Sequence, residues 1–132
     1  MILYRKYDQE KRIDKVWYLS SNIFYSEGND KENELKTVKV VFKNGSTYVY
    51  KDVDVNDYVS FVHGGIDGSN GKALNYFIKK YEFDKLEKTD LQKYIKNDKD
   101  FEKRVKQIAA DVVTELFRVL WQHNAIFKNL SK

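Results

Sequence analysis

Two short runs of alternating apolar residues, joined by a turn sequence, place the strongest constraint on how this chain folds. Thr37–Phe42 and Ser46–Tyr50 alternate in the way that is typical of strands with one buried face. Lys43-Asn44-Gly45 lies between them, and Asn-Gly is a strong signal for a hairpin turn. The sequence therefore predicts an antiparallel hairpin, and with it a sheet.

The length of the hairpin turn decides which side chains share a face of that sheet. A two-residue loop pairs Phe42 with Thr47 and divides the large side chains of the two strands between opposite faces. A three-residue loop, with Gly45 in the left-handed conformation, pairs Phe42 with Ser46 instead. We favour this second register, because a slip of one residue turns every side chain to the other face. It places five apolar side chains on one face: Val38, Val40, Phe42, Tyr48 and Tyr50.

The segments before the hairpin have weaker patterns. Met1–Lys15 is interpreted as an edge segment, and Val16–Ile23 as a strand with Trp17 facing away from Val16 and Tyr18. Ser26–Lys36 is polar and contains Gly, Asn and Asp, so we expect a solvent-exposed loop there.

Helical patterns follow the hairpin. Val53–His63 predicts a helix that Asp54 caps and that Gly64-Gly65 ends. Lys72–Tyr81 predicts a second helix, because its apolar residues recur at helical spacing. Glu82–Asp100 is rich in lysine and mixed in charge, with a short solvated helix expected near Asp90–Ile95. The stripe of the second helix consists of Leu74, Phe77, Ile78 and Tyr81.

The longest helical pattern lies near the end of the chain, at Asp100–Phe127, and it carries two adjacent apolar stripes. A helix that packs on one sheet needs one stripe, so a second stripe favours a homodimer or a higher homo-oligomer. A wide core face in a small domain is the alternative. The prediction is an α+β single domain over 1–132, with a small antiparallel sheet and short helices at 15–83, a charged connector at 84–99 and a long oligomerisation helix at 100–127.

Composition excludes several classes of function. The 132 residues contain no Cys, which excludes disulfides, thiolate zinc sites and cysteine nucleophiles. His63 and His123 lie far apart, without metal-ligand spacing, so no metal site and no cofactor are expected. The net charge of +4 comes from 24 basic and 20 acidic residues spread along the chain, which argues against a dedicated duplex-DNA binder. We found neither a signal-peptide pattern nor an apolar run of membrane-spanning length.

Two motifs in the middle of the chain resemble a known family. F-x-N-G-S-x-Y-x-Y at Phe42–Tyr50 and S-x-G-K-x-x-N at Ser69–Asn75 resemble the KTSC domain, over about Ser20–Phe83. This module also occurs at the end of some lysyl-tRNA synthetases and alone in phage genomes, and the resemblance implies a small antiparallel sheet with helices. The sequence departs from the family in having Asp54 where proline is common and extra residues near Gly64–Asp67.

The whole layout is also similar to phage proteins that counter the Thoeris defence by sequestering its cyclic ADP-ribose signal. That resemblance implies that aromatic side chains hold the base and that arginines of the C-terminal helix hold the phosphates. Arg104 and Arg118 are the arginines of that predicted helix, about four turns apart, and surface or paired roles are the alternative. The resemblance also implies the cytoplasm of a bacterial host cell as the setting.

Further candidate ligand residues come from the side chains themselves. Trp17 and Phe77 are aromatics that can stack on a base, although core packing is the alternative for each, as it is for Trp121. Ser21 lies in a polar cluster beside Trp17 and offers a hydroxyl to a ribose or a base edge. Asn75 is a further candidate, with an alternative role in tying the glycine-rich loop to its helix.

A glycine-rich segment precedes the second helix. Free backbone N–H groups at a helix start attract phosphate, so Gly68, Ser69, Gly71 and Lys72 form a possible phosphate loop. The spacing matches neither a Walker loop nor a Rossmann fingerprint. A turn between two helices, in a chain that contains no proline, is the alternative interpretation.

The function predicted from the sequence is that of a binding protein rather than an enzyme. The resemblance to the phage proteins implies that it sequesters a cyclic ADP-ribose or related cyclic nucleotide signal and so inhibits antiviral defence. The first alternative is a module that binds single-stranded nucleic acid or RNA through exposed aromatics and lysines. The second is an inhibitor of a host defence enzyme that acts through its helix surface. No membrane partner is expected.

Overall fold

The computed structural model describes residues 2–20 and 22–107. The chain divides into two compact units, Met1–Lys88 and Thr89–Lys132, and the division falls inside the predicted connector at 84–99. The first unit contains a sheet and a helical layer. The described part of the second unit contains the 3₁₀-helix η2 (Leu91–Tyr94) and the helix α3 (Lys99–Lys106).

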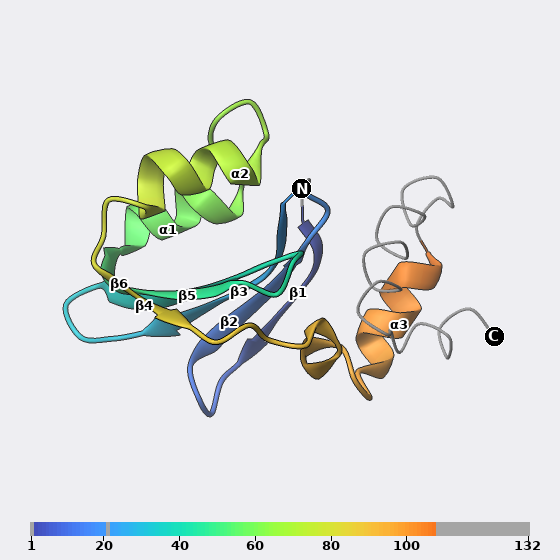
Figure 1. The fold of residues 1–132 in the computed structure, drawn as a ribbon. Coiled ribbons are helices and arrows are strands. Elements are labelled where there is room, and N and C mark those ends of the chain that lie inside the picture. Colours follow the sequence, from blue (N-terminus) through green and yellow to red (C-terminus); the bar gives the residue numbers. More distant parts are fainter. Residues whose placement is uncertain (1, 21, 108–132) are drawn as a thin grey trace. The chain divides into compact units, whose positions relative to one another are not determined.

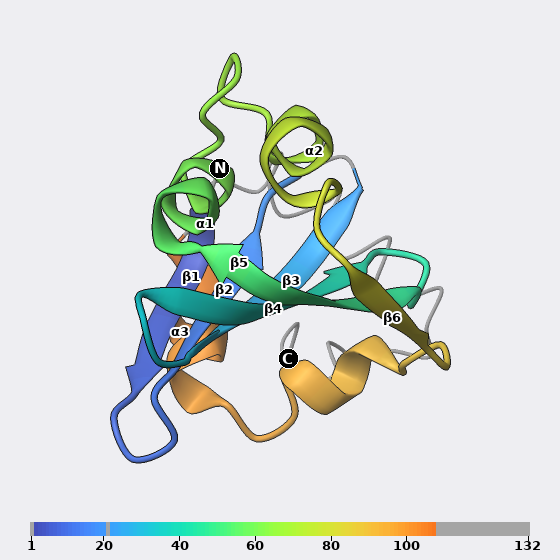
Figure 2. The ribbon, with the colours of Figure 1, turned by 90° about the vertical axis from the view of Figure 1, so that its left-hand side faces the viewer.

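The sheet is a six-stranded antiparallel meander in which each strand pairs with the next along the chain (Figures 1 and 2). This architecture confirms the α+β class. Short connections join β1 to β5 in order, whereas the segment that contains the helical layer joins β5 to its antiparallel neighbour β6. The strands are β1 (Ile2–Asp8), β2 (Ile13–Tyr18), β3 (Ile23–Asp30), β4 (Leu35–Phe42), β5 (Thr47–Asp54) and β6 (Phe83–Leu86).

A helical layer covers one face of this sheet (Figure 1). It consists of α1 (Val55–Val62), α2 (Asn70–Ala73) and the π-helix η1 (Leu74–Ile78). Asp54 caps α1 as predicted, because its carboxylate accepts a hydrogen bond from the Asn56 N–H at 2.8 Å. Gly64 ends the helical turn with a φ of 65°, in the left-handed region that glycine adopts without strain.

The β4–β5 hairpin has the predicted three-residue register. Val40 pairs with Tyr48, and the Phe42 N–H donates to the Ser46 carbonyl at 2.9 Å. Gly45 has a φ of 87°, in the left-handed region, and a residue with a side chain would adopt this backbone conformation only at a cost in free energy. The large side chains of both strands therefore share the face on which the helical layer packs.

Two predictions for the N-terminal half are wrong. Val16–Ile23 is not one strand, because β2 ends at Tyr18 and β3 begins at Ile23. The polar stretch Ser26–Lys36 is not a loop but contains most of β3 and the start of β4. β3 pairs on both sides, and this backbone pairing outweighs its polar composition.

The segment after η1 also differs from the expectation. β6 begins at Phe83 and continues into the predicted connector at 84–99, and it extends the sheet beyond β5. The short helix expected near Asp90–Ile95 is the 3₁₀-helix η2, with Leu91 buried. α3 matches the start of the predicted helix at 100–127, of which residues 108–127 lie outside the described residues. Within the described residues, no helix combines the length and apolar character needed to cross a membrane.

A buried polar contact joins the helical layer to the sheet. The Tyr58 hydroxyl of α1 donates to Asp14 Oδ2 of β2 at 2.8 Å, and Arg5 of β1 binds the same carboxylate at 2.8 and 2.9 Å. Burial raises the pKa of Tyr58, and neighbouring Tyr18 and Asp14 raise it further, so its hydroxyl keeps its proton. The ring of Tyr58 lies against Gly28, where an added Cβ would be 2.4 Å from Tyr58 Cζ.

Gly28→Ala is therefore expected to destabilise the fold. The added methyl group forces Tyr58 and α1 away from the sheet, which should lower the free energy of unfolding by about 1–3 kcal/mol. Urea denaturation followed by fluorescence measures this loss. The matched control is Gly71→Ala, because an added Cβ there would lie 3.8 Å from its nearest neighbour. Equal stability of the two variants would contradict this account.

Candidate functional site

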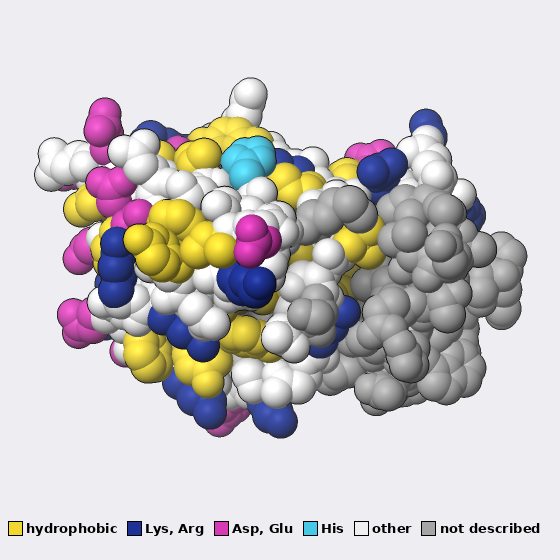
Figure 3. All heavy atoms as spheres, turned by 90° about the horizontal axis from the view of Figure 1, so that it is seen from above, with side chains coloured by type: hydrophobic (Ala, Val, Ile, Leu, Met, Phe, Trp, Pro, Cys, Tyr) yellow, Lys and Arg dark blue, Asp and Glu magenta, His cyan; other side chains and the backbone are white. Residues whose placement is uncertain are grey.

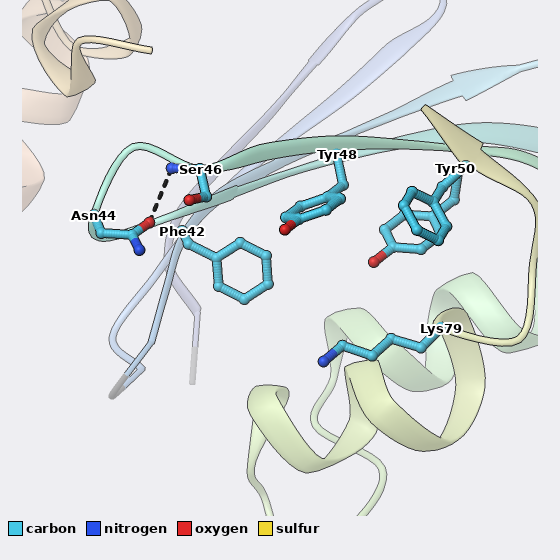
Figure 4. A pocket seen from close by; sticks show the side chains of 7 residues that line it. Phe42, Asn44, Ser46, Tyr48, Tyr50 and Lys79 are labelled. Carbon is cyan, nitrogen blue, oxygen red and sulfur yellow. Dashed lines mark hydrogen bonds between the residues drawn. The ribbon is translucent and has the colours of Figure 1, made fainter. Parts of the chain in front are cut away.

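The helix-covered face of the sheet carries a hollow lined mainly by aromatic side chains, which we call the aromatic hollow (Figure 4). Its volume is about 460 Å³, within the range of small-molecule sites. β4, β5, β6 and the turn of the hairpin line it, together with the residue that follows η1. The lining residues are Phe42, Asn44, Ser46, Tyr48, Tyr50, Lys79 and Phe83.

The rings of this hollow contact one another in a continuous cluster. Tyr48 lies at its centre, with ring centroids 5.8 Å from Phe42, 6.4 Å from Tyr50 and 5.6 Å from Phe83. Phe83 is 49% exposed, so the cluster is open to solvent along β6. Burial raises the pKa of the Tyr50 hydroxyl and neighbouring Tyr48 raises it further, so Tyr50 offers a neutral hydroxyl. Such a cluster can stack on a planar ring.

Lys79 brings a positive charge to the aromatic hollow. It follows the π-helix, where its backbone N–H donates to the Leu74 carbonyl at 3.0 Å. Figure 4 shows its side chain reaching from the helical layer across the hollow from the rings. Within residues 2–20 and 22–107, its amine forms no ion pair. The ammonium is therefore available to an anionic ligand.

A second hollow, of about 320 Å³, adjoins the first and shares Phe42 and Lys79 with it. We call it the polar hollow, because amide, hydroxyl and amine groups supply much of its lining. The residue before β3, the end of β4 and the segment from Ser69 to Lys79 form its walls. The lining residues are Asn22, Phe42, Ser69, Gly71, Lys72, Leu74, Asn75 and Lys79.

The predicted phosphate loop lies at the polar hollow, but its polar groups are largely engaged within the chain. Ser69 Oγ accepts a hydrogen bond from the Lys72 N–H at 3.2 Å, and the Ser69 carbonyl accepts from Ala73. Lys72 Nζ lies 3.6 Å from Asp67 Oδ2. Asn70 donates to the carbonyls of Phe61 and Val62 at 2.9 and 3.0 Å. These bonds fit a turn that ties α2 to the end of α1.

The structure brings some of the predicted ligand residues together and separates others. Ser69, Gly71, Lys72 and Asn75 line the polar hollow, whereas Gly68 does not. Phe77 packs against the core, and Trp17 is 2% exposed, on the sheet face opposite Val16 and Tyr18. Arg104 lies on α3 in the second unit. Ser21, Arg118 and Trp121 lie outside the described residues.

Several lining residues were not among the predicted ligand residues. The predicted register already placed Phe42, Tyr48 and Tyr50 on one face, but only the positions of β6 and the helical layer show that this face forms a hollow. A signal was nevertheless present, since the two motifs that resemble the KTSC domain supply residues to the two adjoining hollows. The missed residues are Asn22, Phe42, Asn44, Ser46, Tyr48, Tyr50, Leu74, Lys79 and Phe83.

Charge around the site is mixed. On the surface seen from above the helical layer, basic side chains lie among acidic and hydrophobic ones (Figure 3). Lys85 on β6 adds a second cation at the aromatic hollow, with its amine 5.7 Å from the centre of the Tyr48 ring. The described residues contain no cluster of three or more His, Asp or Glu side chains able to hold a metal ion.

Comparison with known proteins adds no relative to this description. No family model matches the chain, and no curated protein or solved structure matches it either. The resemblances drawn from the two motifs and from the layout therefore stay predictions.

Asn70→Ala is expected to destabilise the fold, whereas Asn75→Ala should not. Asn70 is 1% exposed, and its loss removes the amide donor of the Val62 carbonyl, whereas the Phe61 carbonyl keeps the Gly64 N–H at 3.1 Å. We expect the free energy of unfolding to fall by about 1–3 kcal/mol. Asn75 is exposed on the next helical segment, so its replacement should cost less than about 0.5 kcal/mol. Chemical denaturation compares them, and a similar loss in both variants would contradict the structural role of Asn70.

Proposed function

We propose that the protein binds a nucleotide in the aromatic hollow and holds it without converting it. One observation carries this proposal: a cluster of contacting rings faces a lysine that forms no ion pair in the described part of the chain. The rings suit a nucleobase, and the ammonium suits a phosphate attached to it. Asn44 and Ser46 at the rim add hydrogen-bonding groups for the edge of the base.

The biological role that we propose is sequestration of a small nucleotide signal. A cyclic ADP-ribose or related cyclic nucleotide is the ligand that the resemblance to the phage proteins implies, and it contains the base and the phosphate that this geometry suits. In this proposal Lys79 takes the role first expected of Arg104 and Arg118. A protein that only sequesters its ligand needs affinity and no reacting groups.

A second candidate function is binding of single-stranded nucleic acid. It is favoured by Lys85, which comes from β6 and lies over Tyr48, while Lys79 comes from the helical layer. A nucleotide within a strand has a phosphate on each side of its sugar, so two lysines from different elements suit it. Open aromatic platforms are typical of such modules.

Nucleotide binding is expected to depend on Tyr48 and Lys79 of the aromatic hollow. Calorimetric titration with AMP and with cyclic ADP-ribose should show binding to the unaltered protein. Tyr48→Ala and Lys79→Ala should each weaken it at least about tenfold, because a stacked ring or a charged contact contributes about 1–3 kcal/mol. Heating the complex should release the ligand chemically unchanged.

Matched controls come from neighbouring positions outside the hollow. Lys80 pairs with Asp57 at 3.1 Å, and Tyr76 is 68% exposed and lines neither hollow. Lys80→Ala and Tyr76→Ala should bind as the unaltered protein does. The proposal would be refuted by the absence of binding at millimolar nucleotide, or by full affinity in both Tyr48→Ala and Lys79→Ala.

Salt dependence separates the two candidate functions. A single-stranded oligonucleotide that contacts several lysines should lose affinity steeply, with a slope of about −0.7 per phosphate contact in a plot of log affinity against log salt. A small nucleotide held mainly through Lys79 should show a slope near −1 or shallower. Titrations of an oligoadenylate and of AMP between low and high salt measure both slopes. Tight oligonucleotide binding without AMP binding would favour the second function.

A further inference from the structure

The polar hollow has the chemistry of a sugar site. Asn22 and Asn75 line this hollow, and within the described residues neither side-chain amide forms a hydrogen bond. Each amide supplies two donors and one acceptor oxygen. Ser69 Oγ adds a further polar atom at the same wall. A ligand with paired hydroxyl groups, which both donate and accept, matches this set.

Charge and ring content distinguish the two hollows. Of the two lysines that line the polar hollow, Lys72 is paired with Asp67, so its positive charge is partly neutralised. Phe42 is the only ring among its lining residues and belongs to the aromatic hollow as well. A second base would therefore lack a stacking platform of its own, whereas a sugar does not need one.

The order of groups along the two hollows follows from their shared residues. Lys79 lies in the lining of both, so an anionic group beside it has the aromatic hollow on one side and the polar hollow on the other. The polar hollow is also the smaller of the two, at about 320 Å³. The base of a nucleotide would therefore lie in the aromatic hollow, its phosphate linkage beside Lys79, and a second sugar, beyond the phosphate, in the polar hollow.

We infer that the polar hollow is a subsite for a ribose-like sugar with a vicinal diol, joined through phosphate to the nucleotide in the aromatic hollow. The ligand class is thus a nucleoside diphosphate linked to a sugar. This inference rests on the proposed function, because the sugar is positioned by the nucleotide to which it is attached. Asn22 and Asn75 bind the diol, and Lys79 binds the phosphate linkage.

ADP-ribose and ADP form the probe pair, because they differ by the second sugar. The double variant Asn22→Ala/Asn75→Ala should weaken ADP-ribose about tenfold, since two hydrogen bonds contribute roughly 1–3 kcal/mol together. It should leave ADP within about twofold. Gly71→Leu tests the same subsite by filling it, because an added Cβ there would point toward Ser69 Oγ and Asn22 Nδ2 at 3.8 and 4.0 Å.

Asn56→Ala is the matched control, since Asn56 is an exposed asparagine of α1 that lines neither hollow. Its affinities for both ligands should be unchanged. Two results would refute the sugar subsite and leave the nucleotide site standing, provided that ADP binds the unaltered protein. In the first, the double variant weakens the binding of ADP and of ADP-ribose equally. In the second, it weakens the binding of neither ligand. If neither ligand binds the unaltered protein, the proposed function fails, and the sugar subsite fails with it.

Discussion

The register of the β4–β5 hairpin is the constraint on which the candidate site depends. The turn contains three residues, and Gly45 supplies the left-handed conformation that a three-residue turn requires. Phe42, Tyr48 and Tyr50 consequently lie on one face of the sheet. A turn shorter by one residue would place Phe42 on the opposite face from the two tyrosines, because side chains alternate along a strand. The aromatic hollow would then lose its continuous set of rings.

The helical layer supplies the other half of the site, and buried contacts hold it on the sheet. Tyr58 connects α1 to Asp14 through a hydrogen bond of 2.8 Å, and Asn70 connects α2 to the last turn of α1. These contacts fix the helical segment from which Lys79 reaches the rings. Tyr81 adds a further tie, since its hydroxyl lies 2.5 Å from Asp57 of α1. The cation therefore comes from an element that is fixed by packing.

The sequence predicted the parts of the fold that local chemistry determines. The hairpin register, the Asp54 cap and the end of α1 each follow from a few adjacent residues. β3 and β6 could not be found in the same way, because the polar β3 is held by pairing with both neighbours and by the room that Gly28 leaves for Tyr58. The site was predicted only in part for the same reason. Lys79 and Phe83 are distant from the hairpin in sequence, and only the helical layer and β6 bring them to it.

A chemical-shift map of the labelled protein titrated with AMP tests the central claim most directly. We expect the amide and side-chain signals of Phe42, Asn44, Ser46, Tyr48 and Lys79 to shift together and to saturate with one affinity. Signals of the opposite sheet face, such as those of Trp17 and Tyr25, should stay in place. Saturable shifts confined to residues outside the two hollows, or no shifts at millimolar AMP, would contradict the central claim.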